Sequence, residues 1–236
     1  MSPTNSSTDG KSGGDLERQH TISPRDQPAL PYIPRDFASP MPLGLLSFAT
    51  SVFMLSLFEL QPRGITVNNI VIANMIFYGG IGQVVSGIME FVTGNTFGAT
   101  VFSSFGGFNL AYAFIFLPGS GIIAAYTDAE TGLPTPEFSQ AVAMFVWGWF
   151  ILSTIFTFAA ARSSWALLLL LFFVDLTFLL IATGHMMSDG AQVLKASAGT
   201  GFVAAAIGYY TGAAGLMNNG VTPFNLPLGS LARKHD

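Results

Sequence analysis

The feature that most constrains this chain is a series of long segments without Asp, Glu, Lys or Arg, which begins near residue 37. The hydrocarbon core of a bilayer is about 30 Å thick, and a helix needs roughly 20 apolar residues to cross it. Only 9% of the residues are charged, where about a quarter is usual in a soluble domain. The sequence therefore predicts an all-α integral membrane protein. The predicted spans are residues 42–60, 67–92, 98–117, 138–160, 164–184 and 196–217.

Composition divides the chain into three parts. Residues 1–36 mix charges with Ser, Gly and Pro and lack apolar periodicity, which predicts a disordered tail. Residues 37–217 form the predicted domain of six transmembrane helices, and residues 218–236 a C-terminal tail. An even number of spans places both termini on one side, and most Lys and Arg residues lie in segments on that side. The positive-inside rule then predicts a multi-pass plasma-membrane protein with both termini in the cytoplasm.

Several function classes are disfavoured by what the chain lacks. It has 3 His and no Cys, too few groups for a convincing catalytic set or metal centre. It has no P-loop sequence, and its net charge of −4 argues against a nucleic-acid partner. We therefore expect no enzyme activity, no cofactor and no metal. A channel or a secondary transporter remains.

Polar side chains inside the predicted spans indicate a lined passage. In lipid such groups turn towards the protein interior, because an unsatisfied polar group there costs several kcal/mol. On the second predicted span, polar and small residues recur every four positions and form one stripe. Hydrogen bonding between helices without transport is the alternative. The candidate pathway side chains are Ser47, Thr50, Asn74, Tyr78 and Ser104.

Two carboxylates within the predicted spans are candidate coupling residues. Asp175 is midway along the fifth span with no basic residue at helical spacing, and Glu90 is near the end of the second. Each is a candidate proton-coupling residue, because a charge at membrane depth is costly unless it is paired, hydrated or neutralised. A protonated Asp175 that bonds to a neighbouring hydroxyl is an equally acceptable interpretation. Glu59 and His185, at span ends, are expected to be a solvated rim residue and an interfacial residue.

Several motifs, in order along the chain, resemble those of the acetate uptake transporter family, also called the succinate-acetate permeases. Ser39, Pro40, Pro42, Leu43 and Gly44 fall on the family signature Asn-Pro-x-Pro-Leu-Gly-Leu, with Ser39 in place of Asn. The resemblance covers nearly all of residues 39–217, and the long polar N-terminal tail looks more like fungal members. Further segments that resemble the family pattern are residues 77–80 with Gln83, Gly87 and Glu90, residues 94–98, and residues 104–108.

The resemblance implies a six-helix subunit that assembles as a homohexamer in the lipid bilayer. Each subunit is expected to carry a pathway for acetate and related short monocarboxylates, sometimes succinate. Family members narrow this pathway with a Phe, a Tyr and a Leu, which fall here on Phe48, Phe105 and Val174. The last two depart from the pattern, and Asp175 stands where an apolar residue is common. We therefore expect a wider and more apolar constriction that admits larger monocarboxylates or the protonated acid.

Three functions remain open from the sequence. The first is transmembrane transport of acetate and related carboxylates, either coupled to protons or channel-like. The second is a channel for ammonia or another small neutral solute, which an apolar constriction also suits. The third is a non-conducting structural or sensory membrane protein, since Ser39, Phe105 and Val174 depart from the family pattern.

Overall fold

The structure, a computed structural model, describes residues 37–217 and 222–231. Regular structure in these ranges is helical, apart from isolated bridges that join Thr127 to Pro134 and Ser164 to Ser230. The tail predicted at residues 1–36 lies outside the described residues, as do residues 218–221 and 232–236 of the predicted C-terminal tail. The elements are α2 (Met41–Glu59), η2 (Pro62–Gly64), α3 (Ile70–Asn74), η3 (Met75–Gly82), α4 (Gln83–Val92), α5 (Thr96–Phe116), α6 (Ile122–Ala125), α7 (Pro136–Ala159), η4 (Ala160–Arg162), α8 (Trp165–Met186) and α9 (Ala191–Leu216).

All six predicted spans are helical, and their ends follow from local side-chain chemistry. The largest difference is at the start of α9, which was expected at residue 196 and begins at Ala191. The Asn95 side chain accepts a hydrogen bond from the backbone N–H of Gly98 at 3.1 Å, which caps the start of α5. Ser164 caps α8 in the same way through the N–H of Leu167. Gly94 adopts a φ of 80° between α4 and α5, a conformation that glycine tolerates best.

Five helical stretches are long and apolar enough to cross a membrane. The 26-residue α9 is not among them, although it was predicted as the sixth span. It is built largely of Gly, Ala and hydroxyl residues and contains Lys195, so its hydropathy is lower than that of the Leu- and Phe-rich helices. The five stretches are Met41–Glu59, Ile70–Val92, Thr96–Phe116, Pro136–Arg162 and Trp165–Met186.

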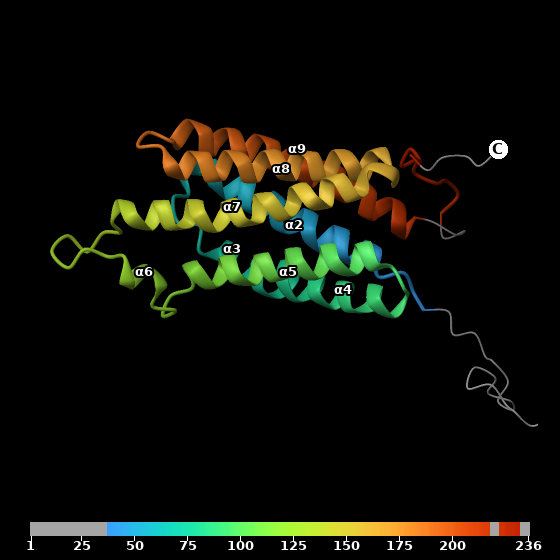
Figure 1. The fold of residues 1–236 in the computed structure, drawn as a ribbon, viewed down its shortest axis with the longest axis horizontal. Helices are drawn as coiled ribbons and strands as arrows, with labels where there is room; N and C mark the ends of the chain where they lie inside the picture. Colours follow the sequence, from blue (N-terminus) through green and yellow to red (C-terminus); the bar gives the residue numbers. More distant parts are fainter. Residues whose placement is uncertain (1–36, 218–221, 232–236) are drawn as a thin grey trace, which may run out of the picture. The chain divides into compact units, whose positions relative to one another are not determined.

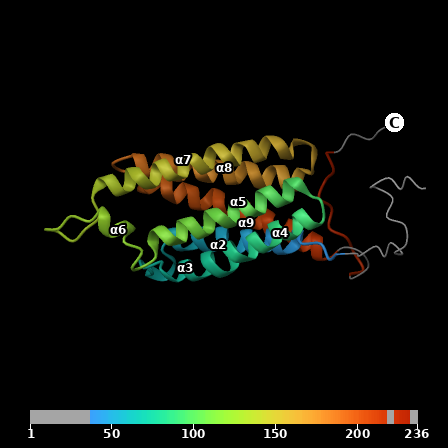
Figure 2. The ribbon, with the colours of Figure 1, turned by 60° about the horizontal axis from the view of Figure 1, so that its bottom comes forward.

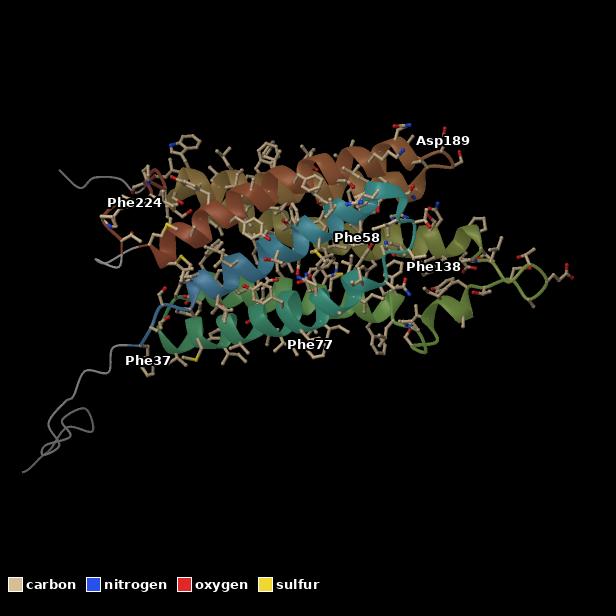
Figure 3. All side chains as sticks on the ribbon, turned by 180° about the vertical axis from the view of Figure 1, so that it is seen from behind. Phe37, Phe58, Phe77, Phe138, Asp189 and Phe224 are labelled. Atoms are coloured by element: carbon tan, nitrogen blue, oxygen red, sulfur yellow. The ribbon has the colours of Figure 1, made fainter. Side chains whose placement is uncertain are left out.

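The helices of residues 38–217 pack side by side around α2. Helix α2 lies between α9 and the stretch formed by α3, η3 and α4, and α9 also packs on α8, as Figures 1 and 2 show. Helix α8 packs on α7, and α4 packs on α5. We call the end of the bundle where α2 begins the Pro40 end, and the end where α2 finishes the Glu59 end. Figure 3 shows Phe224 at the Pro40 end and Asp189 at the Glu59 end.

The second membrane-length helix contains a π-helical segment, η3. Its hydrogen bonds run from i to i+5, so each turn holds an extra residue compared with an α-helix. Gly79 and Gly80 are buried in this segment, and a Cβ on Gly79 would overlap Ser51 Oγ of α2. The predicted four-residue stripe is therefore not continuous, because the π turn changes which residues face inward. Phe77 is 70% exposed and Tyr78 37% exposed, and Figure 3 shows Phe77 on the outer side of this helix.

The connection between α5 and α7 holds the short helix α6 and a tight turn at Asp128. Asp128 Oδ1 accepts hydrogen bonds from the backbone N–H groups of Glu130 and Thr131 and from the Thr131 hydroxyl, at 3.0, 2.8 and 3.0 Å. These bonds favour the charged carboxylate, and they lower the pKa of Asp128 below its ordinary value. The turn is therefore held by an ionised side chain.

Residues 222–231 fold back on the start of α8. The backbone N–H groups of Trp165 and Ala166 donate to the carbonyl oxygens of Gly229 and Leu228 at 2.8 and 3.2 Å. The first N–H groups of a helix have no partner within the helix, so this segment satisfies two of them. The C-terminal segment thereby becomes part of the wall at the Pro40 end.

Candidate functional site

Two cavities approach each other inside the bundle and share the rings of Phe48 and Phe105. The Glu59-end cavity has a volume of about 100 Å³ and is lined from Glu59 and His185 inward to these two rings. The Pro40-end cavity has a volume of about 260 Å³ and is lined from Ser164 and other residues of the Pro40 end to the same rings. The two cavities together mark a candidate route between the ends of the bundle.

Phe105 is the centre of the barrier between these cavities. Its ring centroid lies 5.3 Å from that of Phe48, 5.7 Å from that of Phe156 and 6.3 Å from that of Phe178. Phe105 is 2% exposed and Val174 is 4% exposed. Val174 lines the Glu59-end cavity beside Phe178, which follows it by one helical turn on α8. The constriction is therefore closed by the rings of Phe48, Phe105 and Phe178 from α2, α5 and α8, and Phe156 of α7 packs behind Phe105 without lining either cavity.

The Glu59-end cavity carries the larger share of polar side chains. Glu59 and His185 lie on its wall, and Ser139 Oγ is 3.1 Å from His185 Nδ1. The ring of His185 therefore faces both the cavity wall and α7. The other lining side chains with polar atoms are Ser56, Asn109, Tyr112, Thr177 and Ser197.

The Pro40-end cavity is mostly apolar. Its walls include Leu45, Phe102 and Leu171, all of which are buried. Leu228 of the C-terminal segment also lines it. Its polar lining side chains are Gln83, Asn95, Ser163, Ser164 and Thr211.

A pair of amide side chains joins the two cavity walls. Asn109 lines the Glu59-end cavity and Gln83 lines the Pro40-end cavity. Asn109 Nδ2 donates to Gln83 Oε1 at 3.0 Å and to the backbone carbonyl of Phe105 at 2.9 Å. The pair therefore connects the second and third long helices beside the Phe105 ring. Asn109 was not singled out from the sequence, although it follows Phe105 by one helical turn.

A third cavity of about 430 Å³ lies at the Glu59 end, below the loop of residues 117–124. It shares Leu55, Glu59 and Tyr112 with the Glu59-end cavity, and Asn68 and Asn69 add amide groups. This cavity broadens the approach to the constriction from that end.

Among the predicted pathway residues, the structure brings together Phe48, Phe105 and Val174. The other five line none of the three cavities, and their pathway role stays a prediction. Three of these make hydrogen bonds away from the cavities. Asn74 Nδ2 donates to Ser51 Oγ at 3.0 Å, Thr50 accepts from the Tyr209 hydroxyl at 3.0 Å, and Ser47 Oγ donates to the Gly44 carbonyl at 3.1 Å. Tyr78 is exposed. Ser104 is half-buried on α5.

The signature residues at the start of α2 contribute to helix packing through a backbone carbonyl and through the small size of Gly44. The Pro40 carbonyl accepts a hydrogen bond from Ser86 Oγ at 2.8 Å. A Cβ on Gly44 would lie 2.7 Å from both the Phe102 ring and Ser86 Oγ, so only glycine fits there without a shift. Ser39 and Leu43 are exposed, and Pro42 lies in the first turn of the helix, where its fixed φ suits helix initiation. These residues set how closely α2 approaches the second and third long helices.

Neither candidate coupling carboxylate lines the three cavities. Glu90 is 2% exposed, and its Oε2 accepts a hydrogen bond from Asn95 Nδ2 at 2.6 Å. Asp175 faces α7, where Thr157 Oγ1 donates to its Oδ2 at 3.0 Å. Both carboxylates thus lie in contacts between helices or at a helix start. Among the described residues, no group of three or more His, Asp or Glu side chains is arranged to hold a metal ion.

Comparison with known proteins places this architecture in a family. A family model described as the GPR1/FUN34/yaaH family matches residues 20–233. Acetate permease A of Emericella nidulans is 41% identical over 199 residues, which cover 82% of this chain and 66% of that protein. Ammonia transport outward protein 2 of Saccharomyces cerevisiae is 35% identical over 196 residues, which cover 81% of this chain and 67% of that protein. The chain thus spans about two thirds of the length of these fungal relatives.

A solved structure shares the fold. The structure titled as that of the bacterial acetate channel SatP matches with a TM-score of 0.70 and 27% sequence identity, over 82% of this chain and 100% of that one. Together with the family match and the apolar helices, this likeness identifies a multi-pass membrane protein. The chain belongs to the GPR1/FUN34/yaaH family.

Proposed function

We propose that the protein moves acetate and related short-chain carboxylates across the plasma membrane. The observation that carries this proposal is the pair of cavities that approach from opposite ends and meet at Phe48 and Phe105. Relatives named as an acetate permease and an acetate channel support acetate as the substrate class. The aromatic constriction separates the two cavities and controls passage between them.

A carboxylate would cross this route with neutral hydrogen-bond donors. Among the described residues that line the two cavities, none is Lys or Arg. Neutral hydroxyl groups such as those of Ser56 and Tyr112 take the place of fixed cations. A route without fixed positive charge holds an anion weakly, which suits rapid release.

We propose α9 as the sixth span and cytoplasmic positions for both termini. At 1.5 Å per residue, its 26 residues measure about 39 Å, which exceeds the hydrocarbon thickness. It packs on α2 and α8, both of membrane length. The Pro40-end cavity then opens to the cytoplasm, and the Glu59-end cavity opens to the outside.

We propose a homohexamer for the assembled protein. The outward face of α9 is exposed in the single chain, and it mixes Lys195, Gly199 and Ala206 with the larger side chains of Val203 and Tyr210. The small residues Gly199 and Ala206 would let a helix of another subunit approach closely. The mass of the purified protein in detergent, measured by light scattering, tests this assembly.

Selectivity is proposed to depend on the departures at Phe105 and Val174. A Tyr at 105 would add a hydroxyl donor, and a Leu at 174 would add a methylene to the wall of the Glu59-end cavity. The double variant Phe105→Tyr with Val174→Leu should therefore shift uptake towards acetate and away from larger monocarboxylates. An unchanged substrate profile in this variant would contradict the idea.

Reconstituted protein tests the proposed function directly. Uptake of labelled acetate, propionate and succinate into proteoliposomes is measured with a pH gradient and a membrane potential imposed separately. Uptake of acetate above the level of protein-free vesicles is expected. Uptake that follows the proton gradient indicates symport, and uptake that follows the potential alone indicates an anion channel. No uptake under either condition would favour the non-conducting alternative.

A channel for ammonia is the second candidate. The Glu59 carboxylate at the mouth of the Glu59-end cavity attracts cations and repels anions, and a relative is named as an ammonia transport outward protein. Flux of a neutral amine would be insensitive to membrane potential. Labelled methylamine in the same vesicles distinguishes this candidate, because it would enter where acetate does not.

A further inference from the structure

Gln83 buries an amide nitrogen that has no hydrogen-bond partner among the described residues. The side chain is 0% exposed, and its Nε2 is without a partner. A buried N–H donor without a partner is costly, because it has lost its bonds to water without replacing them. Beside a transport route, water or a substrate that enters the route supplies the missing acceptor.

The direction of the Gln83 amide follows from its neighbours. The Phe105 carbonyl is only an acceptor, so the atom of Asn109 that lies 2.9 Å from it must be the nitrogen Nδ2. The second hydrogen of that nitrogen then meets an acceptor at 3.0 Å, which must be Gln83 Oε1. Gln83 consequently turns its oxygen to Asn109 and keeps both hydrogens of Nε2 free.

The position of this donor matches the constriction. Gln83 lines the Pro40-end cavity together with Phe48 and Phe105, and its partner Asn109 lines the cavity on the other side. The rings of Phe48 and Phe105 close the same place with apolar surface. A carboxylate that passes the rings would otherwise find no donor at the point where it is least hydrated.

We propose that Gln83 Nε2 receives the substrate carboxylate at the constriction and that Asn109 is a positioning residue that holds the Gln83 amide in place. This inference rests on the proposed transport of carboxylates and adds a specificity-determining residue to it. The substrate reaches the Gln83 amide when the Phe48 and Phe105 rings move apart. The amide then replaces hydrogen bonds to water that the carboxylate loses at the constriction. An amide that donates without charge also lets the anion leave again.

The test compares two Gln83 variants of the full chain in proteoliposomes with labelled acetate. Gln83→Leu removes the donor nitrogen and the oxygen that accepts from Asn109, whereas Gln83→Glu keeps that oxygen and replaces the nitrogen with a second carboxyl oxygen, which repels an anion when ionised. A hydrogen bond to a charged group contributes enough to change affinity by about tenfold to a hundredfold. Both variants are therefore expected to raise the half-saturating acetate concentration by about this factor.

Ser51→Ala is the matched control. Ser51 is also 0% exposed and accepts a hydrogen bond from Asn74 in the contact between α2 and the second long helix, but it lines none of the three cavities. It should leave the half-saturating concentration unchanged. If folded Gln83→Leu shows the wild-type value, the amide serves only to hold the helices and the inference is overturned. If the wild-type protein itself passes no acetate, the proposed function fails instead.

Discussion

Replacing Phe105 with Ala should join the two cavities that its ring separates. The cavities of about 100 and 260 Å³ both include Phe105 in their walls. Removal of the ring leaves Phe48 and Phe178 without their common neighbour. A larger carboxylate such as succinate would then meet a continuous space of at least about 360 Å³.

The cost to stability can be worked from the ring contacts. Phe105 pairs with three rings at centroid distances of 5.3, 5.7 and 6.3 Å. At about 0.5–1.5 kcal/mol for each aromatic pair, these contacts contribute about 1.5–4.5 kcal/mol beyond simple burial. The variant should therefore denature at lower temperature in detergent, and transport must be compared at equal amounts of folded protein.

The assay is competitive uptake of labelled acetate and succinate into proteoliposomes. We expect the ratio of succinate to acetate uptake to rise by about tenfold or more in Phe105→Ala, which corresponds to a barrier lowered by about 1.4 kcal/mol. Phe156→Ala is the matched control. Phe156 is buried and packs its ring 5.7 Å from that of Phe105, but it lines neither of the two cavities.

Two results would refute this reasoning. A wild-type uptake ratio in folded Phe105→Ala would mean that the ring does not form the barrier. An equal change in Phe156→Ala would mean that general loosening of the aromatic cluster, rather than the opening of the wall, alters selectivity.

Three further predictions follow from the structure. Asp175→Asn should preserve the hydrogen bond from Thr157. Proton-driven acetate uptake should then stay within about twofold of the wild-type rate, since one neutral hydrogen bond replaces another. Loss of that uptake would instead make Asp175 a coupling residue. Gly229→Ala should release the C-terminal segment, since Gly229 has a φ of 69° and an added Cβ would lie 3.2 Å from the Trp165 ring. In limited proteolysis, the variant should be cut near residue 229 faster than the wild-type protein. Equal rates of cutting in the two proteins would contradict this. Because the pKa of Asp128 is lowered, the carboxylate stabilises its turn fully at pH values above the ordinary pKa of 3.8, and this stabilisation is lost as the pH falls through the lowered pKa. The carboxyl chemical shift of Asp128, followed by NMR, should titrate with a midpoint below 3.8. A midpoint at or above 3.8 would refute the lowered pKa.

The helices were predictable because charge-free runs and turn residues carry a strong signal. Gly94 and Asn95, residue types typical of turns, separate the second and third long helices between Val92 and Thr96. The sixth predicted span carries a weaker signal. Gly and Ala in α9 allow close helix packing but contribute little to the mean hydropathy of the helix. The six helices were predicted correctly from the sequence, and membrane crossing by α9 stays a prediction.

The site was predictable only in part. Phe48, Phe105 and Val174 were identified by resemblance, and the structure brings them together. Phe178 and the bond from Asn109 to Gln83 were missed, because single-helix periodicity does not reveal which faces of different helices meet. The inward-facing stripe predicted from the four-residue spacing after Asn74 was also interrupted by the π turn of η3. No sequence signal marked this change of helical period.

The π turn of η3 makes the second long helix unusually tolerant of the loss of one residue. A π turn closes its hydrogen bond from i to i+5 instead of i to i+4, so it takes up one extra residue while the helix beyond it keeps nearly the same direction. Deleting one residue between Met75 and Gly82 would therefore restore an ordinary α-helix and keep Gln83, Ser86 and Glu90 close to their present partners. The same deletion within α4 would rotate every later residue by about 100° and shift it by about 1.5 Å along the axis. In an alignment of related proteins, a one-residue gap within η3 therefore preserves the inward-facing side chains that follow it, whereas a gap within α4 changes them.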